Sequence, residues 1–315
     1  MSSPAFALGQ VLRGRLSSYT LSKKVKEGIW FAKNHANELV VVKSDNGQSR
    51  VENERDVLQR FQSRSSYIRP LIDEIQDPPE PTAIVLRHLE SDLLQASVQN
   101  RLHREEIKYV SRRVLESLDV LHQDGYVHTD VKPSNILVNY GEDQGVMRFS
   151  DVQLGDFGDS YPQDSRWAKS GTQVGAPIWS SPEVLMETPW TTATDIWSFG
   201  TLLISLIYGG DFNLFRPKTS RYGDEDYAVE IVKQQFRYFG PFPLTIREIV
   251  SEETLTSILY LMHMIPPESM TPFSTVTEHE VSQEDKQFIL KIMQMDWRDR
   301  PTARLLLQDD WFQKE

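Results

Sequence analysis

The N-terminal part of the chain alternates between apolar and polar positions in short runs. From residue 19 the runs YTLSKKV, IWFAK and ELVVVKS are separated by the turn-rich segments KEG and NHAN. Runs of this length, bounded by turn residues, are typical of strands in an antiparallel meander. Two further strands are predicted at YIRPLIDEI and AIVLRHL, on either side of the proline-rich turn DPPEP. Residues 1–18 show no clear period, and we treat them as an N-terminal extension.

Farther along the chain the apolar positions follow a helical period. The run NERDVLQRF places Glu54 and Leu58 one turn apart on the same face of a predicted helix. A second helix, closed by Gly125, is predicted by a stripe that consists of Ile107, Val110, Val114, Leu115, Leu118 and Leu121. DIWSFGTLLISLIYGG is apolar nearly all round, which predicts a helix buried among others. Residues 211–285 are expected to be helical and loop-rich, and LLLQDDWF to form a short closing helix.

The segment YVHTDVKPSNIL joins the Gly125 helix to a predicted strand and places three polar side chains at short spacings. Asp130 is suited to accept or orient a substrate hydroxyl, Lys132 to neutralise a migrating phosphoryl group, and Asn135 to offer an amide oxygen to a metal ion. The plainer alternative is that an Asp and an Asn in a polar segment only form turns. The chemistry that the spacing favours is phosphoryl transfer.

Further charged residues stand at the ends of predicted elements. Lys43 follows the apolar residues 40–42, and a lysine there lies either at an edge with its ammonium in water or against an anion. Glu54 follows eleven residues later on the predicted helix, where the alternative is a solvated surface charge. The predicted strands ILVNY and MRFSDVQL flank the polar turn GEDQG and lead to GDFGD, in which Asp156 offers a second oxygen ligand for magnesium.

These motifs, in this order, resemble those of the eukaryotic protein kinases over about residues 19–312. HTDVKPSN resembles the H-R-D-x-K-x-x-N loop, GDFG contains D-F-G, GAPIWSSPE is similar to G-T-P-x-Y-x-A-P-E, and WRDRPT contains R-P-T. The HTD variant and the segment GPFP are similar to sequences in the SR-protein kinase and cyclin-dependent kinase-like branch. The resemblance implies an α+β, bilobal, protein kinase-like fold. Its small antiparallel-sheet N-lobe spans residues 19–89, and its larger, mostly helical C-lobe spans residues 90–315.

The resemblance also implies roles for individual residues. Lys43 holds the α and β phosphates of ATP and is positioned by Glu54, and Gly28 is what remains of the glycine-rich loop. Leu86 takes the gatekeeper position, the backbone of Leu89 lies against adenine, and Asp92 reaches the ribose. Asp130 and Lys132 are catalytic, and Asn135 and Asp156 hold Mg²⁺. The structural positions are His128, Phe157, Gly158, Glu183, Asp195 and Arg300, of which Glu183 pairs with Arg300 and Asp195 binds the backbone of the HTD loop.

Three departures from the family pattern bear on activity. The glycine-rich loop is shortened and retains only Gly28, Thr129 stands where most members carry arginine, and Ala176 replaces a threonine that steadies the catalytic Asp and Lys. The leading hypothesis is a Ser/Thr protein kinase that uses ATP and Mg²⁺. The alternative is a pseudokinase scaffold with weak or no phosphotransfer. A small-molecule phosphotransferase would share the catalytic residues but is not expected to carry SPE, DIWSFG and RDRPT, which build a peptide-docking lobe.

Composition narrows the class of protein without naming its substrate. The chain of 315 residues is long enough for a sizeable core and contains no cysteine, which excludes disulfides and thiolate chemistry. Nowhere do eighteen apolar residues occur together, so we expect an intracellular protein of the cytoplasm or nucleus with no membrane contact. The net charge of −11 argues against nucleic acid as a partner. It favours a basic or Arg/Ser-rich protein substrate, unless the charge serves solubility alone. We expect a monomer.

Overall fold

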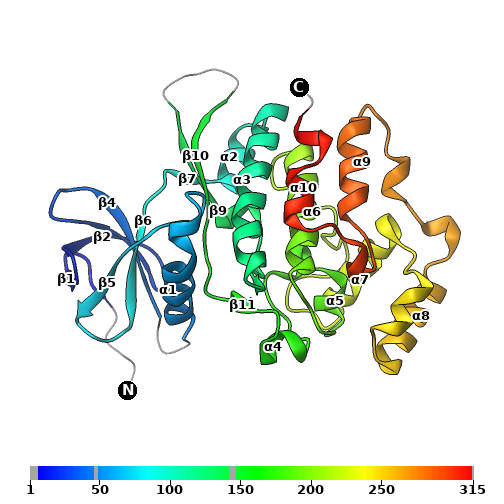
Figure 1. The fold of residues 1–315 in the computed structure, drawn as a ribbon, viewed down its shortest axis with the longest axis horizontal. Helices are drawn as coiled ribbons and strands as arrows, with labels where there is room; N and C mark the ends of the chain where they lie inside the picture. The colour runs from blue at the N-terminus through cyan, green and yellow to red at the C-terminus, as the bar shows by residue number, and fades with distance from the viewer. Residues whose placement is uncertain (1–5, 46–48, 142–146, 314–315) are drawn as a thin grey trace.

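The computed structural model describes residues 6–45, 49–141 and 147–313. Six antiparallel strands form a closed barrel in the order β1-β2-β3-β4-β6-β5 at the N-terminal end (Figure 1). These strands are β1 (Val11–Gly14), β2 (Ser18–Lys26), β3 (Ile29–Lys33), β4 (Leu39–Ser44), β5 (Leu71–Asp77) and β6 (Ala83–Arg87). The predicted meander is confirmed, because β2, β3 and β4 are consecutive antiparallel neighbours.

The strand β1 lies inside the stretch that the sequence pattern assigned to an N-terminal extension. Leu12 is fully buried, and β1 pairs with both β2 and β5. The carboxylate of Asp73 in β5 accepts the N–H of Arg15 at 3.0 Å and the hydroxyl of Tyr19 at 2.9 Å, which ties the turn after β1 to the barrel. The barrel therefore starts ahead of the boundary predicted at residue 19, because partners distant in sequence complete its first strand.

Alternate residues of β4 serve two different cores, which explains its unbroken apolar run. Val40 and Val42 belong to the barrel interior. Val41 faces the opposite side, in one cluster with Leu58 of helix α1 (Arg50–Phe61) and Leu86 of β6. That second cluster continues into the helical part of the chain, so the two parts share one core. A strand buried on both faces needs apolar residues at every position.

The larger part of the chain is mostly helical. Its helices are α2 (Leu93–Gln99), α3 (Arg104–Gln123), α4 (Arg166–Lys169), α5 (Pro182–Leu185), α6 (Ala193–Tyr208), α7 (Tyr227–Phe239), α8 (Glu252–Met264), α9 (Gln283–Ile292) and α10 (Ala303–Leu307). The same part contains two small sheets, one of β7 (Ser91–Asp92), β9 (Ile136–Tyr140) and β10 (Phe149–Leu154), the other of β8 (Tyr126–Val127) and β11 (Tyr161–Pro162). The predicted α+β, two-part fold is confirmed.

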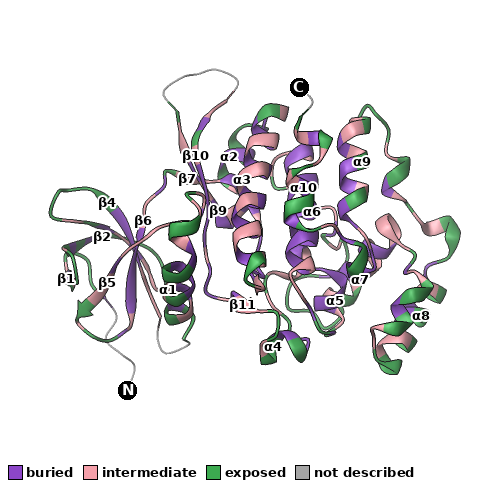
Figure 2. Ribbon diagram, viewed as in Figure 1, coloured by how far each residue is buried: buried purple, intermediate pink, exposed green. Residues whose placement is uncertain are grey.

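Burial along the helices follows the predicted periods. The apolar stripe of α3 is buried, and Gly125 follows the helix at φ +69°. Helix α6 is buried along almost its whole length, whereas α8 is largely exposed at the far edge (Figure 2). The predicted polar turn between β9 and β10 lies largely outside the described residues. Within residues 6–45, 49–141 and 147–313, no helix is both long and apolar enough to cross a membrane.

Candidate active site

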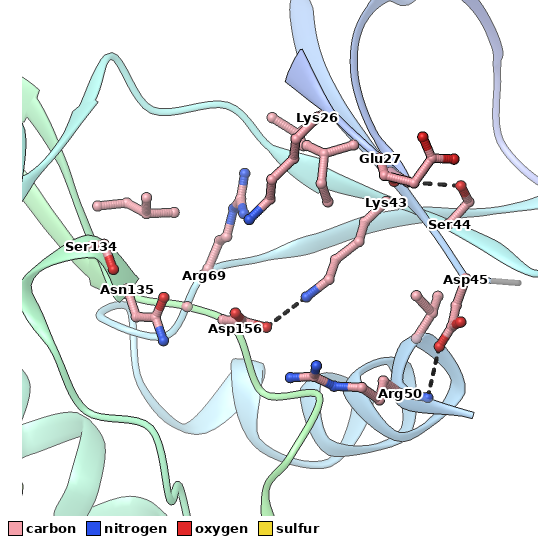
Figure 3. Close-up of a pocket in the computed structure, with 16 residues that line it drawn as sticks. Lys26, Glu27, Lys43, Ser44, Asp45, Arg50, Arg69, Ser134, Asn135 and Asp156 are labelled. Carbon is pink, nitrogen blue, oxygen red and sulfur yellow. Dashed lines mark hydrogen bonds and ion pairs between the residues drawn. The ribbon is translucent and has the colours of Figure 1, made fainter. Parts of the chain in front are cut away.

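A cavity of about 450 Å³ lies where the barrel meets the helical part (Figure 3). The barrel supplies residues of β3, β4 and the β2–β3 turn, and α1 supplies two residues of its first turn. The opposite wall comes from the segment before β9, from β9 itself, and from Gly155 and Asp156 after β10. We call this space the interlobe cavity.

The ammonium of Lys43 at the end of β4 lies between two carboxylates. Its Nζ is 2.6 Å from Glu54 Oε2 on α1 and 2.6 Å from Asp156 Oδ1 (Figure 3 draws the second contact). Burial by itself would lower the pKa of Lys43, but the charges and hydrogen bonds of Glu54 and Asp156 raise it overall. Burial would raise the pKa of Asp156, but Lys43 outweighs it and lowers that pKa to about 2. Lys43 and Asp156 are therefore both charged at neutral pH.

The carboxylate of Asp130 is held by three donors. Lys132 Nζ donates to Asp130 Oδ2 at 2.6 Å, and Asn135 Nδ2 donates to the same oxygen at 2.8 Å. The backbone N–H of Ala176 donates to Oδ1 at 3.2 Å. Although Ala176 lacks the expected threonine hydroxyl, its main chain still contacts the carboxylate. Asp130 is thus fixed beside a cation, as a group that orients a substrate hydroxyl requires.

The oxygens of Asn135 and Asp156 fit a hard divalent cation. The amide nitrogen of Asn135 is engaged by Asp130, so the amide is oriented with its oxygen available to the cavity. Asp156 adopts φ +65°, an uncommon backbone state for a residue other than glycine, and keeps Oδ2 apart from the Lys43 bond. Among the described residues no three His, Asp or Glu side chains gather as a complete metal site. A cation bound here therefore also needs oxygens from a phosphate or from water.

Two buried carboxylates hold the loop that carries Asp130 and the segment after Asp156. Asp195 of α6 accepts the backbone N–H of His128 at 2.8 Å and that of Thr129 at 2.8 Å. Glu54 accepts the N–H of Phe157 at 3.2 Å, and the rings of Phe157 and His128 pack edge to face at 4.8 Å. The loop, α1 and the segment after Asp156 are therefore joined in one buried arrangement.

A buried ion pair lies deeper in the helical part. Arg300 donates from Nη1 to Glu183 Oε1 at 2.6 Å and from Nη2 to Oε2 at 2.9 Å, and both side chains are fully buried. The same guanidinium donates to the carbonyls of Ala193 and Gln294. This bidentate pair joins α5 to the start of α6 and the segment before α10.

The segment after Asp156 is fastened to α1 and to the HTD loop. Asn53 Nδ2 on α1 donates to the carbonyls of Gly158 and Ser160, each at 3.0 Å. The hydroxyl of Thr129 donates to the carbonyl of Asp159 at 2.7 Å, and Arg50 pairs with the Asp159 carboxylate. Thr129 therefore contacts this segment directly, where a kinase with arginine at that position uses a charged side chain.

The expected glycine-rich loop is a tight turn. Lys26 and Ile29 pair across it, so Glu27 and Gly28 form a two-residue hairpin. Gly28 has φ +70°, and a Cβ there would lie 2.5 Å from the carbonyl oxygen of Ser44. Only glycine fits this position without displacing the neighbouring strand.

Three residues predicted at the nucleotide do not line the interlobe cavity. Leu86 and Leu89 are buried, and Asp92 accepts the N–H of Gln95 at 2.9 Å as the N-cap of α2. Burial raises the pKa of Asp92. The roles given to these residues stay predictions, as do those of the other site residues.

The structure adds residues that the sequence reasoning did not single out. Asn53 and Arg50 reach the segment after Asp156, and Arg69 lines the interlobe cavity. Arg69 interrupts the apolar start of the predicted strand YIRPLIDEI. That interruption was the one local feature of the sequence that could have drawn attention to Arg69. Nothing in the local pattern around Asn53 and Arg50 indicated their contacts, because their partners lie more than a hundred positions later.

Comparison with known proteins agrees with this geometry. Residues 8–312 match the family model described as the protein kinase domain. The calcium/calmodulin-dependent protein kinase type 1 of Macrobrachium nipponense is 30% identical over 193 residues, which are 61% of this chain and 52% of that protein. The serine/threonine-protein kinase shk1/pak1 of Schizosaccharomyces pombe is 35% identical over 117 residues, 37% of this chain and 17% of that protein. The chain thus spans about half or less of the matched relatives' lengths.

A solved structure has a similar fold over nearly the whole chain. A chain of the yeast RNA Pol II CTD kinase CTDK-1 complex superposes with a TM-score of 0.74 at 22% identity, covering 99% of this chain and 97% of that one. At this identity the likeness concerns the fold alone.

Proposed function

The chain belongs to the protein kinase domain family, and we propose that it transfers the γ-phosphoryl group of ATP to a serine or threonine hydroxyl of a protein substrate. The observation that carries the proposal is that Lys43 lies between Glu54 and Asp156 at the interlobe cavity, while Asp130 and its partner Lys132 lie on the same loop as the cavity-lining Asn135. Nucleotide and divalent-metal use is general to this domain. The names of the matched relatives support Ser/Thr specificity.

Each residue has a chemical task in that reaction. Asp130 orients the substrate hydroxyl and takes its proton as the oxygen attacks the γ-phosphorus, while the bond to the bridging oxygen of the nucleoside diphosphate breaks. Lys132, 2.6 Å from Asp130, neutralises charge on the phosphoryl oxygens. Lys43 binds the remaining phosphates, and Asn135 and Asp156 would hold Mg²⁺, which screens phosphate charge. The pseudokinase scaffold was considered partly because Ala176 lacks the hydroxyl that steadies the catalytic Asp. Asp130 nevertheless keeps three donors, so that departure does not release its carboxylate.

We infer that the protein substrate is basic. A second cavity, of about 400 Å³, lies along the segment after Asp156 and is lined by Asp159, Tyr161 and Tyr222 among others. Tyr222 is followed two to four positions later in the sequence by the acidic residues 224–226. Acidic side chains there would attract arginine or lysine in a substrate. Equal kcat/KM for basic and acidic Ser-containing peptides would contradict this part of the proposal.

The main experiment measures Mg²⁺-dependent phosphate incorporation from labelled ATP into a basic Ser-containing protein. Asp130→Asn is expected to lower the rate of phosphate incorporation at least a hundredfold, because it deletes the charge that orients the substrate hydroxyl. Asp211→Asn is the matched control, because Asp211 is an exposed aspartate paired only with Arg216 in the described structure. Thermal melts check that both variants fold. Phosphate transfer by folded Asp130→Asn at the wild-type rate would refute the assignment.

A further inference from the structure

Arg69 places a guanidinium inside the interlobe cavity. It precedes β5, and its Nε donates to the backbone carbonyl of Arg87 at the end of β6, at 2.9 Å. Burial lowers the pKa of this guanidinium to about 10 against the opposing charges of Glu54 and Asp156, so it stays protonated at neutral pH. In the described structure no hydrogen bond involves its Nη1 or Nη2 atoms, although Arg69 lines the cavity. The guanidinium therefore offers unused donors there (Figure 3).

We expect the base beside Arg69, because Arg69 bonds the carbonyl of Arg87, two residues before Leu89, whose backbone the family resemblance places against adenine. The phosphates of a bound nucleotide are expected at Lys43, Asn135 and Asp156, so the base lies toward the apolar wall. Leu137 belongs to that wall, and an atom at the Cβ position of Gly155 would be 3.4 Å from both Leu137 Cδ1 and Arg69 Cδ. Arg69 thus stands beside the apolar wall, close to Gly155.

Adenine and guanine differ at position 6 in what they present to such a cation. Adenine carries an amino group there, which donates and has to find an acceptor, whereas guanine carries the acceptor O6 beside the N7 acceptor that both bases share. The Arg87 carbonyl, a backbone acceptor at this end of the cavity, already receives the Arg69 bond. A base with O6 and N7 acceptors can instead receive the free guanidinium N–H groups in a bidentate contact.

We propose that Arg69 determines base specificity and lets guanine compete with adenine, so that GTP serves this chain as phosphoryl donor at least as well as ATP. The proposal deepens the proposed function and rests on it for the place of the phosphates. Bidentate guanidinium contacts to guanine discriminate between bases by about five- to a hundredfold. We expect the preference between GTP and ATP to shift by that factor when the Arg69 guanidinium is removed.

The test measures Kd by calorimetry for the magnesium complexes of ATP, GTP and ITP, using the full chain without peptide. Wild type should bind GTP and ITP at least as tightly as ATP, because ITP shares O6 and N7 with GTP. Arg69→Val should shift the ATP-to-GTP Kd ratio by about tenfold toward ATP. If Val destabilises the fold in a thermal melt, Arg69→Met keeps the volume and serves instead.

The matched control is Lys26→Met, which removes another cavity-lining cation from β2. This variant should raise the Kd for ATP and the Kd for GTP by the same factor and leave the ratio of the two Kd values unchanged. The proposal is overturned if wild type binds ATP ten times more tightly than GTP, or if Arg69→Val leaves the ratio of the two Kd values unchanged. It is also overturned if Lys26→Met shifts the ratio equally, or if inorganic triphosphate competes as well as GTP. Absence of phosphate transfer from either nucleotide, with the binding preference intact, would instead refute the proposed function.

Discussion

The contacts between Asn53 and the segment after Asp156 predict activity without phosphorylation of that segment. Asn53 donates two hydrogen bonds, to the carbonyls of Gly158 and Ser160, and each such bond contributes about 0.5–1.5 kcal/mol. Asn53→Ala should therefore weaken the ordered arrangement by about 1–3 kcal/mol, which corresponds to a fall in kcat/KM of roughly five- to a hundredfold. Thr129→Val removes one bond, to Asp159, and should cost about half of that free energy.

The residue at position 129 argues in the same direction, although two hydroxyl residues of the segment are exposed. Ser160 is fully buried and donates to the carbonyl of His128, whereas Ser170 and Thr172 are exposed and bond to each other. Thr129 lacks the charge with which an arginine would hold a phosphate beside Asp130. Phosphatase-treated wild type should therefore keep nearly all its activity.

The assay compares kcat/KM for phosphatase-treated wild type, Asn53→Ala and the control Gln59→Ala. Gln59 lies on the same helix, but its amide donates to Glu74 of the barrel and not to the segment after Asp156. The control should retain wild-type kcat/KM. A tenfold fall of wild-type activity after phosphatase treatment, or an unchanged rate in folded Asn53→Ala, would refute the reasoning.

Three further predictions concern charged residues. Lys43→Met and Asp156→Asn should each abolish phosphotransfer yet leave cooperative thermal melts, and an unfolded variant or a wild-type rate would contradict the role. Arg300→Met should lower the free energy of unfolding by about 3–5 kcal/mol in urea, because Glu183 loses its buried partner; a loss below about 1 kcal/mol would disprove this. Folding lowers the pKa of Asp156 from 3.8 to about 2. The stabilisation it provides should therefore be complete above about pH 4 and disappear toward pH 2, and unfolding of wild type against Asp156→Asn across this range checks the sign.

Local spacing in the sequence determined most of the fold and the catalytic loop. The short strand runs, the helical stripe ending at Gly125 and the all-apolar α6 each specify an element through neighbours a few positions away. Asp130, Lys132 and Asn135 could be assigned together because six consecutive positions of one loop contain all three. The shortened turn at Gly28 was readable for the same reason.

Only the tertiary structure decided which distant segments meet. The strand β1 has too few residues to show a period, and its partners in β2 and β5 complete it. In the sequence Arg69 is only a charged residue within an apolar stretch, whereas in the structure it lies against Arg87 and Gly155. In the sequence Asn53 is one polar residue among several on a predicted helix, and only the packing of the segment after Asp156 on α1 shows its role. The orientation of a side chain toward a cavity depends on such long-range packing, whereas the period of a strand or helix depends on adjacent residues.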